Sequence, residues 1–223
     1  MSHFASSAGN FDAFTEQQNM LFLAAVDELR HLLPNSNFTT HIANSAALFT
    51  GLSPMGDAVR PGIAMFGVLP QHLAPHLLQP VLMLRTQIAF FKDIPANTPV
   101  GYDSTWVSHA TTRIATLPIG YNDGVPYRLG LSGNSQVLVR GQRCPIIGRV
   151  SMDYCTIDVS HIEGADIGDI VTIIGRDGDE SITIQDVAAQ SGTIAYEVCC
   201  TIGSRVPRRY IDSSVVAQPH THA

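Results

Sequence analysis

The stretch from Leu69 to Pro80 carries three prolines and separates two parts of the chain that have different patterns. Before it, strand-like and helix-like apolar runs alternate, which is typical of βα units in a parallel sheet. After it, turn clusters such as Asp177-Gly178-Asp179 separate short β-rich runs, which favours an all-β sandwich or barrel. We therefore predict an α/β part, a partial β/α barrel over residues 1–80, then an all-β domain over residues 81–212 and a flexible tail at residues 213–223.

Three strands and two helices are predicted in the first part. Thr15-Glu16-Gln17-Gln18 is typical of a capping box that opens a helix, and Pro34 ends the helical spacing that follows. A second, short helix is predicted for Ser45 to Leu52. A complete β/α barrel needs about 250 residues, so three βα units are expected to leave an open sheet edge and an uncovered core. The strands are predicted from Ser2, over Phe38 to Ala43 and over Gly62 to Val68.

Six β-rich runs and one helix are predicted in the second part. Thr183 is expected to cap a helix over Ile184 to Gln190, which Gly192 would close. The strands are predicted for Val81 to Phe91, Thr112 to Leu117, Gln136 to Val139, Pro145 to Val150, Tyr154 to Val159 and Ile170 to Ile174.

Charge and cysteine content exclude several classes of protein. A net charge of -6 with no basic run argues against a nucleic-acid or anionic-membrane partner. The chain has no window of roughly 18 uncharged apolar residues, so no membrane span is expected. It does not open like a signal peptide, so a cytoplasmic protein is expected. The cysteines lack CxxC spacing, which favours buried free thiols over a disulfide framework or a metal site: Cys144, Cys155, Cys199 and Cys200.

A candidate phosphate site lies between His41 and Ile63. Ser45 follows one predicted strand and Gly62 lies at an end of another, and they offer a hydroxyl and a bare backbone N–H. Helix N-termini favour anions, and β/α barrels commonly bind phosphate in the loops after their last strands. The Ser45 hydroxyl could also serve as a simple helix cap. This segment therefore predicts binding of a phosphorylated ligand.

Several further motifs follow in a fixed order along the chain. They include Val100-Gly101-Tyr102, Gly120-Tyr121-Asn122-Asp123-Gly124, Ile147 to Asp153 and Thr193 to Glu197. Each motif alone is weak, but their combination from His3 to about Arg209 is specific, and it resembles alanine racemase. The resemblance implies the last three βα units of a TIM barrel, which holds pyridoxal phosphate, followed by a β-domain that reaches into the partner's active site in a homodimer. It also implies interconversion of L- and D-alanine, which supplies D-alanine for peptidoglycan.

The resemblance also implies roles for residues around the cofactor. His3 falls where the family stacks a histidine on the cofactor ring, with His41 as a support. Arg60 falls where an arginine faces the pyridine nitrogen. Because a guanidinium only donates, that nitrogen would stay unprotonated and the cofactor would be a weaker electron sink. Without the resemblance, Arg60 would be interpreted as part of a surface salt bridge. Phosphate contacts are implied for Ser45, Gly62, Ile63 and Tyr196.

Tyr102 is the implied catalytic residue. Racemisation needs one base on each face of the substrate α-carbon, and in the family a lysine and this tyrosine serve the two faces. Without the resemblance, Tyr102 would be interpreted as an aromatic residue of a strand. Met152 falls where the backbone meets the substrate carboxylate, Tyr121 at a gate of the substrate channel, and Arg149 in a polar network near the entrance.

Two departures from the family pattern are visible. The family's Schiff-base lysine has no counterpart, because the single lysine, Lys92, lies in the predicted β-domain. The family usually has an arginine soon after the Gly120–Gly124 motif, whereas here Tyr127 comes first and Arg128 follows it. We therefore expect the chain alone to be inactive and to need self-association or a complementary N-terminal half. The alternatives are a racemase of broader specificity, a decarboxylase of the same fold, which the Gly120–Gly124 motif disfavours, and a non-catalytic or split-gene interaction half.

Overall fold

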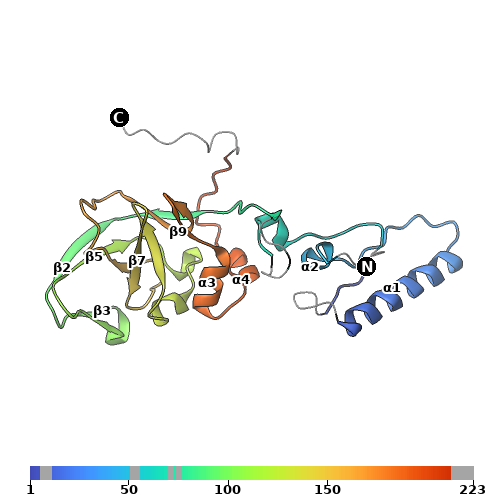
Figure 1. Ribbon diagram of the computed structural model, residues 1–223, viewed down its shortest axis with the longest axis horizontal. Coiled ribbons are helices and arrows are strands. Elements are labelled where there is room, and N and C mark those ends of the chain that lie inside the picture. The colour runs from blue at the N-terminus through green and yellow to red at the C-terminus, as the bar shows by residue number, and fades with distance from the viewer. Residues whose placement is uncertain (6–11, 51–55, 70–72, 74–76, 212–223) are drawn as a thin grey trace.

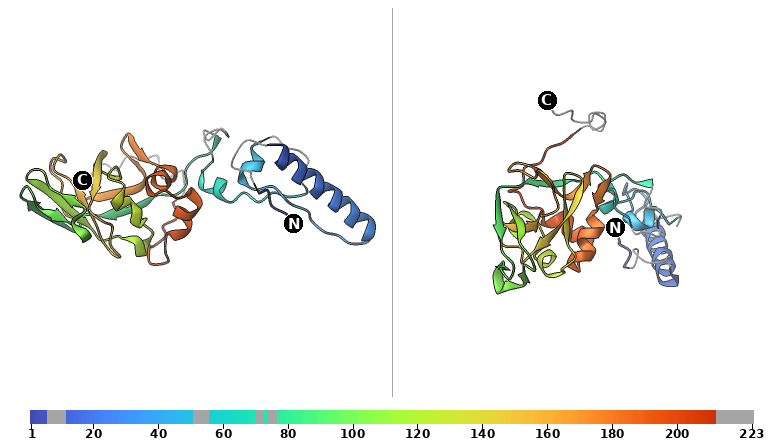
Figure 2. Two further views of the ribbon diagram at one scale, coloured as in Figure 1. Left: turned by 90° about the horizontal axis from the view of Figure 1, so that it is seen from below. Right: turned by 60° about the vertical axis from the view of Figure 1, so that its left-hand side comes forward.

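The computed structural model describes residues 1–5, 12–50, 56–69, 73 and 77–211. The β-rich part lies at one end of an elongated molecule, and helix α1 (Ala13–Leu32) lies at the other (Figures 1 and 2). No helix in the described part of the chain is both long enough and apolar enough to cross a membrane. The predicted tail at residues 213–223 and half of the proline-rich stretch lie outside the described residues.

Helix α1 begins earlier than its predicted capping box. Asp12 is the N-cap, and its carboxylate accepts hydrogen bonds from the backbone N–H and the hydroxyl of Thr15, both at 2.9 Å. Thr15 therefore lies inside the first turn, and its predicted role as the cap is wrong. The helix ends at Leu32, shortly before Pro34, which confirms the predicted stop.

The predicted strands of the first part do not form regular ladders within the described residues. Ser2 donates to the carbonyl of His41 at 3.1 Å, and His41 forms only isolated bridges with Gly56 and Ala58. Parallel strands depend on hydrogen bonds from neighbours on both sides, and few neighbours are present here.

The prediction of a strand over Gly62 to Val68 is wrong. This segment holds a 3₁₀ helix, η1 (Ile63–Phe66), which ends at Gly67 with a left-handed φ of 76°. The short helix before it, α2 (Ser45–Leu48), is confirmed at its start. The helix ends at Leu48 with Phe49 as its C-cap, so the predicted extension over Phe49 and Thr50 is wrong, and Gly51 and Leu52 lie outside the described part of the chain.

The second part forms an antiparallel eight-stranded sheet with the strand order β1-β9-β6-β7-β8-β5-β2, and β10 pairs with β9. All six predicted β-rich runs contain strands of this sheet. A separate ribbon pairs β3 (Pro99–Val100) with β4 (Trp106–Val107). The strands of the sheet are β1 (Leu84–Gln87), β2 (Phe90–Ile94), β5 (Thr112–Leu117), β6 (Gln136–Val139), β7 (Gln142–Ile147), β8 (Cys155–Asp158), β9 (Ile170–Asp177) and β10 (Glu180–Ile182).

Two short helices follow the sheet. Helix α3 (Ile184–Ser191) has a capping box between Thr183 and Asp186 and ends at Gly192, as predicted. Helix α4 (Ala195–Thr201) has no side-chain cap at its N-terminus, and the sequence did not predict it.

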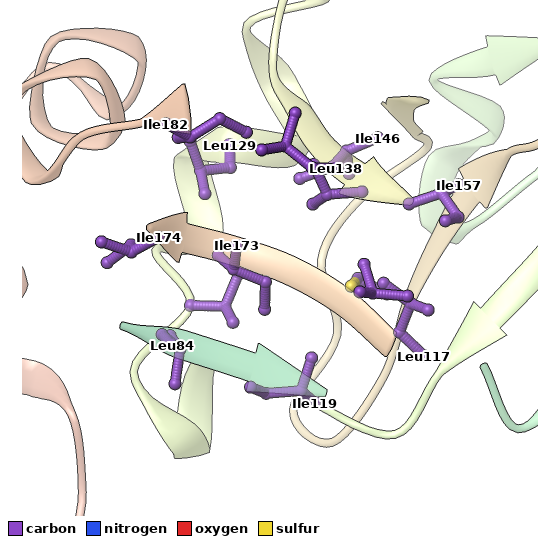
Figure 3. Packing of buried hydrophobic residues seen from close by; sticks show 14 of the residues in the cluster. Leu84, Leu117, Ile119, Leu129, Leu138, Ile146, Ile157, Ile173, Ile174 and Ile182 are labelled. Atoms are coloured by element: carbon purple, nitrogen blue, oxygen red, sulfur yellow. The ribbon is translucent and has the colours of Figure 1, made fainter. Parts of the chain in front are cut away.

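The main apolar core fills the inside of the β-domain (Figure 3). It gathers buried side chains from β1, β6, β7, β8 and β9, such as Leu138 and Ile157, and it also includes Ile63 beside η1. A much smaller cluster in the first part joins Phe4 and Ile42 to Phe22 of α1. The four cysteines are free; Cys144 and Cys155 are buried as predicted, whereas Cys199 is half-buried and the predicted burial of Cys200 is wrong, because it is exposed.

Candidate active site

Arg60 is the centre of a polar group in the first part of the chain. Its Nη1 lies 2.5 Å from Nδ1 of His41, and its Nη2 lies 2.9 Å from Nδ1 of His3 and 2.8 Å from the carbonyl oxygen of Ser2. Because a guanidinium can only donate, the Nδ1 atoms of both imidazoles accept from it. The structure therefore brings together three residues that the sequence singled out.

The Nε–H of Arg60 is available for a ligand. Its Nε–H makes no hydrogen bond to any residue of the described part of the chain, whereas Nη1 and Nη2 are engaged with the histidines and backbone carbonyls. The contacts of Nη1 and Nη2 hold the side chain in place. Arg60 is thus a fixed cation with an N–H available for an acceptor atom, such as a ring nitrogen.

Ser45 and Gly62 form a small cradle between α2 and η1. Ser45 is 2% exposed, and its Oγ accepts a hydrogen bond from the backbone N–H of Ala64 at 3.2 Å. A Cβ on Gly62 would lie 4.0 Å from this Oγ, so the Gly62 backbone lies directly beside the hydroxyl. Asn44 caps α2 by accepting from Ala47 at 3.1 Å, so Ser45 is not the helix cap. The hydroxyl hydrogen of Ser45 can therefore donate to an oxyanion, and Ile63 begins η1 beside it.

Tyr196 lies on α4 in the second part of the chain. No hydrogen bond joins it to Ser45, Gly62 or Ile63 within the described residues. Burial raises the pKa of the Tyr196 phenol above its ordinary value. The hydroxyl therefore stays protonated at neutral pH and can donate to an anion.

Tyr102 lies in an exposed turn directly after β3. The turn is the 3₁₀ helix η4 (Tyr102–Ser104), and the Tyr102 side chain is 71% exposed. The backbone has left-handed φ angles of 77° at Gly101, 58° at Asp103 and 49° at Ser104. Two of these residues are not glycine, so this turn holds an uncommon conformation on either side of the tyrosine.

Arg149 joins the Tyr102 turn to a second segment. Its Nη2 lies 2.8 Å from the Asp103 carboxylate, and its Nη1 donates to the hydroxyl of Tyr127. Its guanidinium carbon also lies 5.8 Å from the centre of the Tyr127 ring. The polar network predicted for Arg149 is therefore present, and it contains Tyr127, the residue that departs from the family pattern.

Tyr121 and Met152 lie on two loops that hydrogen bonds hold together. The backbone N–H of Tyr121 donates to the carbonyl of Ser151, and Asn122 donates to the carbonyl of Met152, both at 3.0 Å. The Tyr121 and Tyr127 rings make an edge contact with centroids 6.1 Å apart. Met152 is exposed, so both of these predicted substrate residues face a space that a ligand can reach.

Comparison with known proteins identifies the family. A family model described as "Alanine racemase, C-terminal domain" matches residues 81–210, and one described as "Alanine racemase, N-terminal domain" matches residues 1–70. The chain belongs to the alanine racemase family. An alanine racemase of Halothermothrix orenii is 41% identical over 212 residues, which are 94% of this chain and 55% of that protein.

Solved structures of alanine racemases agree with this assignment. The Bacillus anthracis enzyme with bound L-Ala-P has a TM-score of 0.85 and is 38% identical, over 95% of this chain and 54% of that one. The Bartonella henselae enzyme with covalently bound pyridoxal phosphate has a TM-score of 0.77 and is 31% identical, over 94% and 55%. These likenesses confirm the predicted fold class, a partial barrel followed by a β-domain. The chain spans about half the length of the relatives that it matches.

The residues that resemble those of alanine racemase form two separate groups in this chain. The Arg60 group and the Ser45 cradle lie beside α2, whereas β3, which leads directly into Tyr102, lies at the opposite end of the molecule (Figure 1). Sequence reasoning missed Asp103 as a partner of Arg149, because an ion pair between such distant residues leaves no local pattern.

Proposed function

We propose that this chain is part of a racemase that interconverts L- and D-alanine with pyridoxal 5'-phosphate. The observation that carries the proposal is the arrangement beside α2, where Arg60 with its two histidines lies close in sequence to the Ser45–Gly62 cradle. A fixed cation with a remaining N–H suits a ring nitrogen, and a hydroxyl beside backbone N–H groups suits a phosphate. D-alanine made in the cytoplasm would serve peptidoglycan synthesis.

The residues present fit this cofactor, which supplies an electron sink for a carbanion at the substrate α-carbon. Ser45 and the backbone of Gly62 and Ile63 would hold the phosphate, and Tyr196 would donate its hydroxyl hydrogen to it. Arg60 would donate to the ring nitrogen and keep it unprotonated, since a guanidinium does not release a proton. His3 would lie along the ring, fixed by its contact with Arg60.

Tyr102 would exchange the proton on one face of the substrate α-carbon. Its exposure and its distance from α2 along the molecule support a role in the site of another copy of the chain, which makes the functional unit a homodimer. Tyr121 and the backbone of Met152 would face the same substrate from loops that are already locked together. A base must lie within hydrogen-bond reach of the proton that it moves, so a separate copy has to supply Tyr102.

The reaction also needs an amine on the other face of the substrate, and the described residues place no lysine near the Arg60 group. The single lysine, Lys92, lies on β2, where it pairs with Ile114 of β5, at the end of the β-domain away from α2 (Figure 1). We therefore propose that a complementary N-terminal half supplies this amine. The same observation favours a second candidate, a non-catalytic half that only binds a partner chain.

The test combines this chain with the portion of the Halothermothrix orenii racemase that it does not match, together with pyridoxal phosphate and L-alanine. D-alanine, measured by chiral chromatography, is expected from the mixture but not from either part alone. The matched variants Tyr102→Phe and Arg60→Met should both abolish it. The relative's own two portions, mixed in the same way, are the positive control. No D-alanine from the mixture beside an active control would refute the proposal and favour the non-catalytic half.

A further inference from the structure

The turn that carries Tyr102 holds its shape against the backbone preference of its own residues. Asp103 and Ser104 both adopt left-handed φ angles, which non-glycine residues adopt infrequently, although aspartate tolerates them better than most. Such conformations persist when the surrounding structure determines them. The contacts around this turn therefore decide where Tyr102 points.

Two contacts from the Gly148–Arg149 segment meet this turn. The first is a close backbone approach, because a Cβ on Gly101 would lie 2.9 Å from the backbone nitrogen of Arg149 and one on Gly148 would lie 2.7 Å from the carbonyl oxygen of Val100. The second is the ion pair at 2.8 Å between Asp103 and the Arg149 guanidinium. The backbone contact fixes the base of the turn, and the ion pair fixes its far side.

Arg149 is itself well anchored. Its side chain is only 25% exposed, whereas that of Asp103 is 70% exposed. Its guanidinium donates to Tyr127 and lies against the ring of that residue. A planar guanidinium with several fixed donors holds a carboxylate in one orientation, which a flexible ammonium does not. Asp103 is therefore the movable partner, and Arg149 is the fixed one.

We infer that Asp103 is a positioning residue for Tyr102, and that its ion pair with Arg149 aims the phenol at the substrate. The catalytic role of the Tyr102 orientation rests on the proposed racemase function, whereas the control of that orientation by Asp103 does not. A reacting group that is misplaced by about 1 Å can cost about a hundredfold in rate. Without the ion pair, the exposed tyrosine would sample several directions. The inference also gives Tyr127 a use, because its hydroxyl helps to orient the arginine.

The first experiment reads the geometry in the full chain alone. The six tyrosines are replaced by 3-fluorotyrosine, and the Tyr102 resonance is assigned with Tyr102→Phe. Asp103→Asn keeps the size and the tolerance for left-handed φ but removes the charge, so it should shift or broaden this resonance. The Tyr210 resonance should not move, since that side chain is 95% exposed near the end of the described residues. Asp179→Asn, an exposed turn aspartate, is the matched control and should leave Tyr102 unchanged.

Arg149→Lys separates charge from geometry. It keeps the positive charge but loses the planar fork, so its effect on the Tyr102 resonance should lie between those of the wild type and Asp103→Asn. The thermal midpoint of each variant is measured alongside. A loss of fold would move many tyrosine resonances together, whereas the proposed role moves one. An unchanged Tyr102 resonance in a folded Asp103→Asn chain would overturn the inference.

The second experiment uses the mixture with the complementary portion of the relative. Asp103→Asn should lower kcat by about tenfold to a hundredfold with little change in KM, because the aim of the base matters more in the transition state than in substrate binding. An unchanged kcat would overturn the positioning role. If the wild-type mixture makes no D-alanine although the fluorine signal responds, the proposed function fails while the control of Tyr102 by Asp103 stands.

Discussion

Thr172 lies in the middle of β9 with its side chain fully buried, opposite Leu138 of β6. Its hydroxyl makes no hydrogen bond to any described residue. A buried polar group without a partner lowers stability, because it loses its hydrogen bonds to water and gains none in return. This position therefore separates the effect of shape from the effect of polarity, since valine has nearly the same shape as threonine.

We predict that Thr172→Val raises the free energy of unfolding by about 1 kcal/mol, because it removes the unpaired hydroxyl from the core. Urea unfolding measures this change. Thr112→Val is the control: its hydroxyl donates to the carbonyl of Ala110 at 2.9 Å, so that substitution should lower the same free energy. A loss of stability in both variants would show that the Thr172 hydroxyl has a partner after all.

A buried thiol makes stability depend on alkaline pH. Burial raises the pKa of Cys155 from 9.0 to about 12. Below pH 9 the thiol is protonated in both states, so its contribution is fully present there. Between about 9 and 12 the unfolded chain ionises first, and the free energy of unfolding should fall by up to about 1.4 kcal/mol per pH unit. Urea unfolding of Cys155→Ala should show a smaller slope in this range, whereas Cys200→Ala, at an exposed position, should keep the wild-type slope.

At the scale of elements, the sequence predicted those that depend on local signals. Helix α3 has its capping box and its closing glycine within one short segment, and the strands of the β-domain follow β-rich runs. The parallel strands predicted for the first part do not form regular ladders among the described residues, because their hydrogen bonds depend on neighbouring strands. The segment predicted as the last of them is η1 instead, which ends at Gly67 with a left-handed φ. Helix α4 lacks a capping side chain, so no local signal marked its start.

The candidate site follows the same division. Its candidate chemical residues stand in ordered motifs, so a sequence alone can propose them. The contacts that hold those residues join distant segments. Arg60 contacts His3, which lies 57 positions earlier in the sequence. Arg205, which follows α4, forms ion pairs with the carboxylates of Asp123 and Asp153. Such pairings depend on the folded chain, and a single sequence does not reveal them.

At the scale of the whole molecule, the two parts differ in how much apolar surface they bury. The β-domain has one large core, whereas the separate buried cluster of the first part, among its described residues, consists of Phe4, Ile42, Ala43 and Ala47. Helix α1 meanwhile exposes several large apolar side chains: Phe14, Met20, Leu21, Leu29, Leu32 and Leu33. A uniformly stable molecule is not expected from such a distribution.

We predict that backbone amides of α1 exchange with deuterium much faster than those of β6, β7 and β9. Opening α1 exposes little buried apolar surface, whereas opening the central strands disrupts the main core. Hydrogen–deuterium exchange with mass spectrometry measures the difference. Addition of the complementary racemase portion should slow exchange in α1 more than in the sheet, if that portion covers the exposed side chains. Equal protection of both parts in the chain alone would contradict this account.

The wide separation of Arg60 from Tyr102 has a genetic consequence. If each site takes Arg60 from one copy and Tyr102 from another, two different defective chains can repair each other. A dimer of one Arg60→Met chain and one Tyr102→Phe chain contains one site with both residues intact and one site with neither. Random pairing of equal amounts would leave about a quarter of all sites intact. With the complementary N-terminal half also present, two inactive alleles supplied together would then behave as a partly active gene.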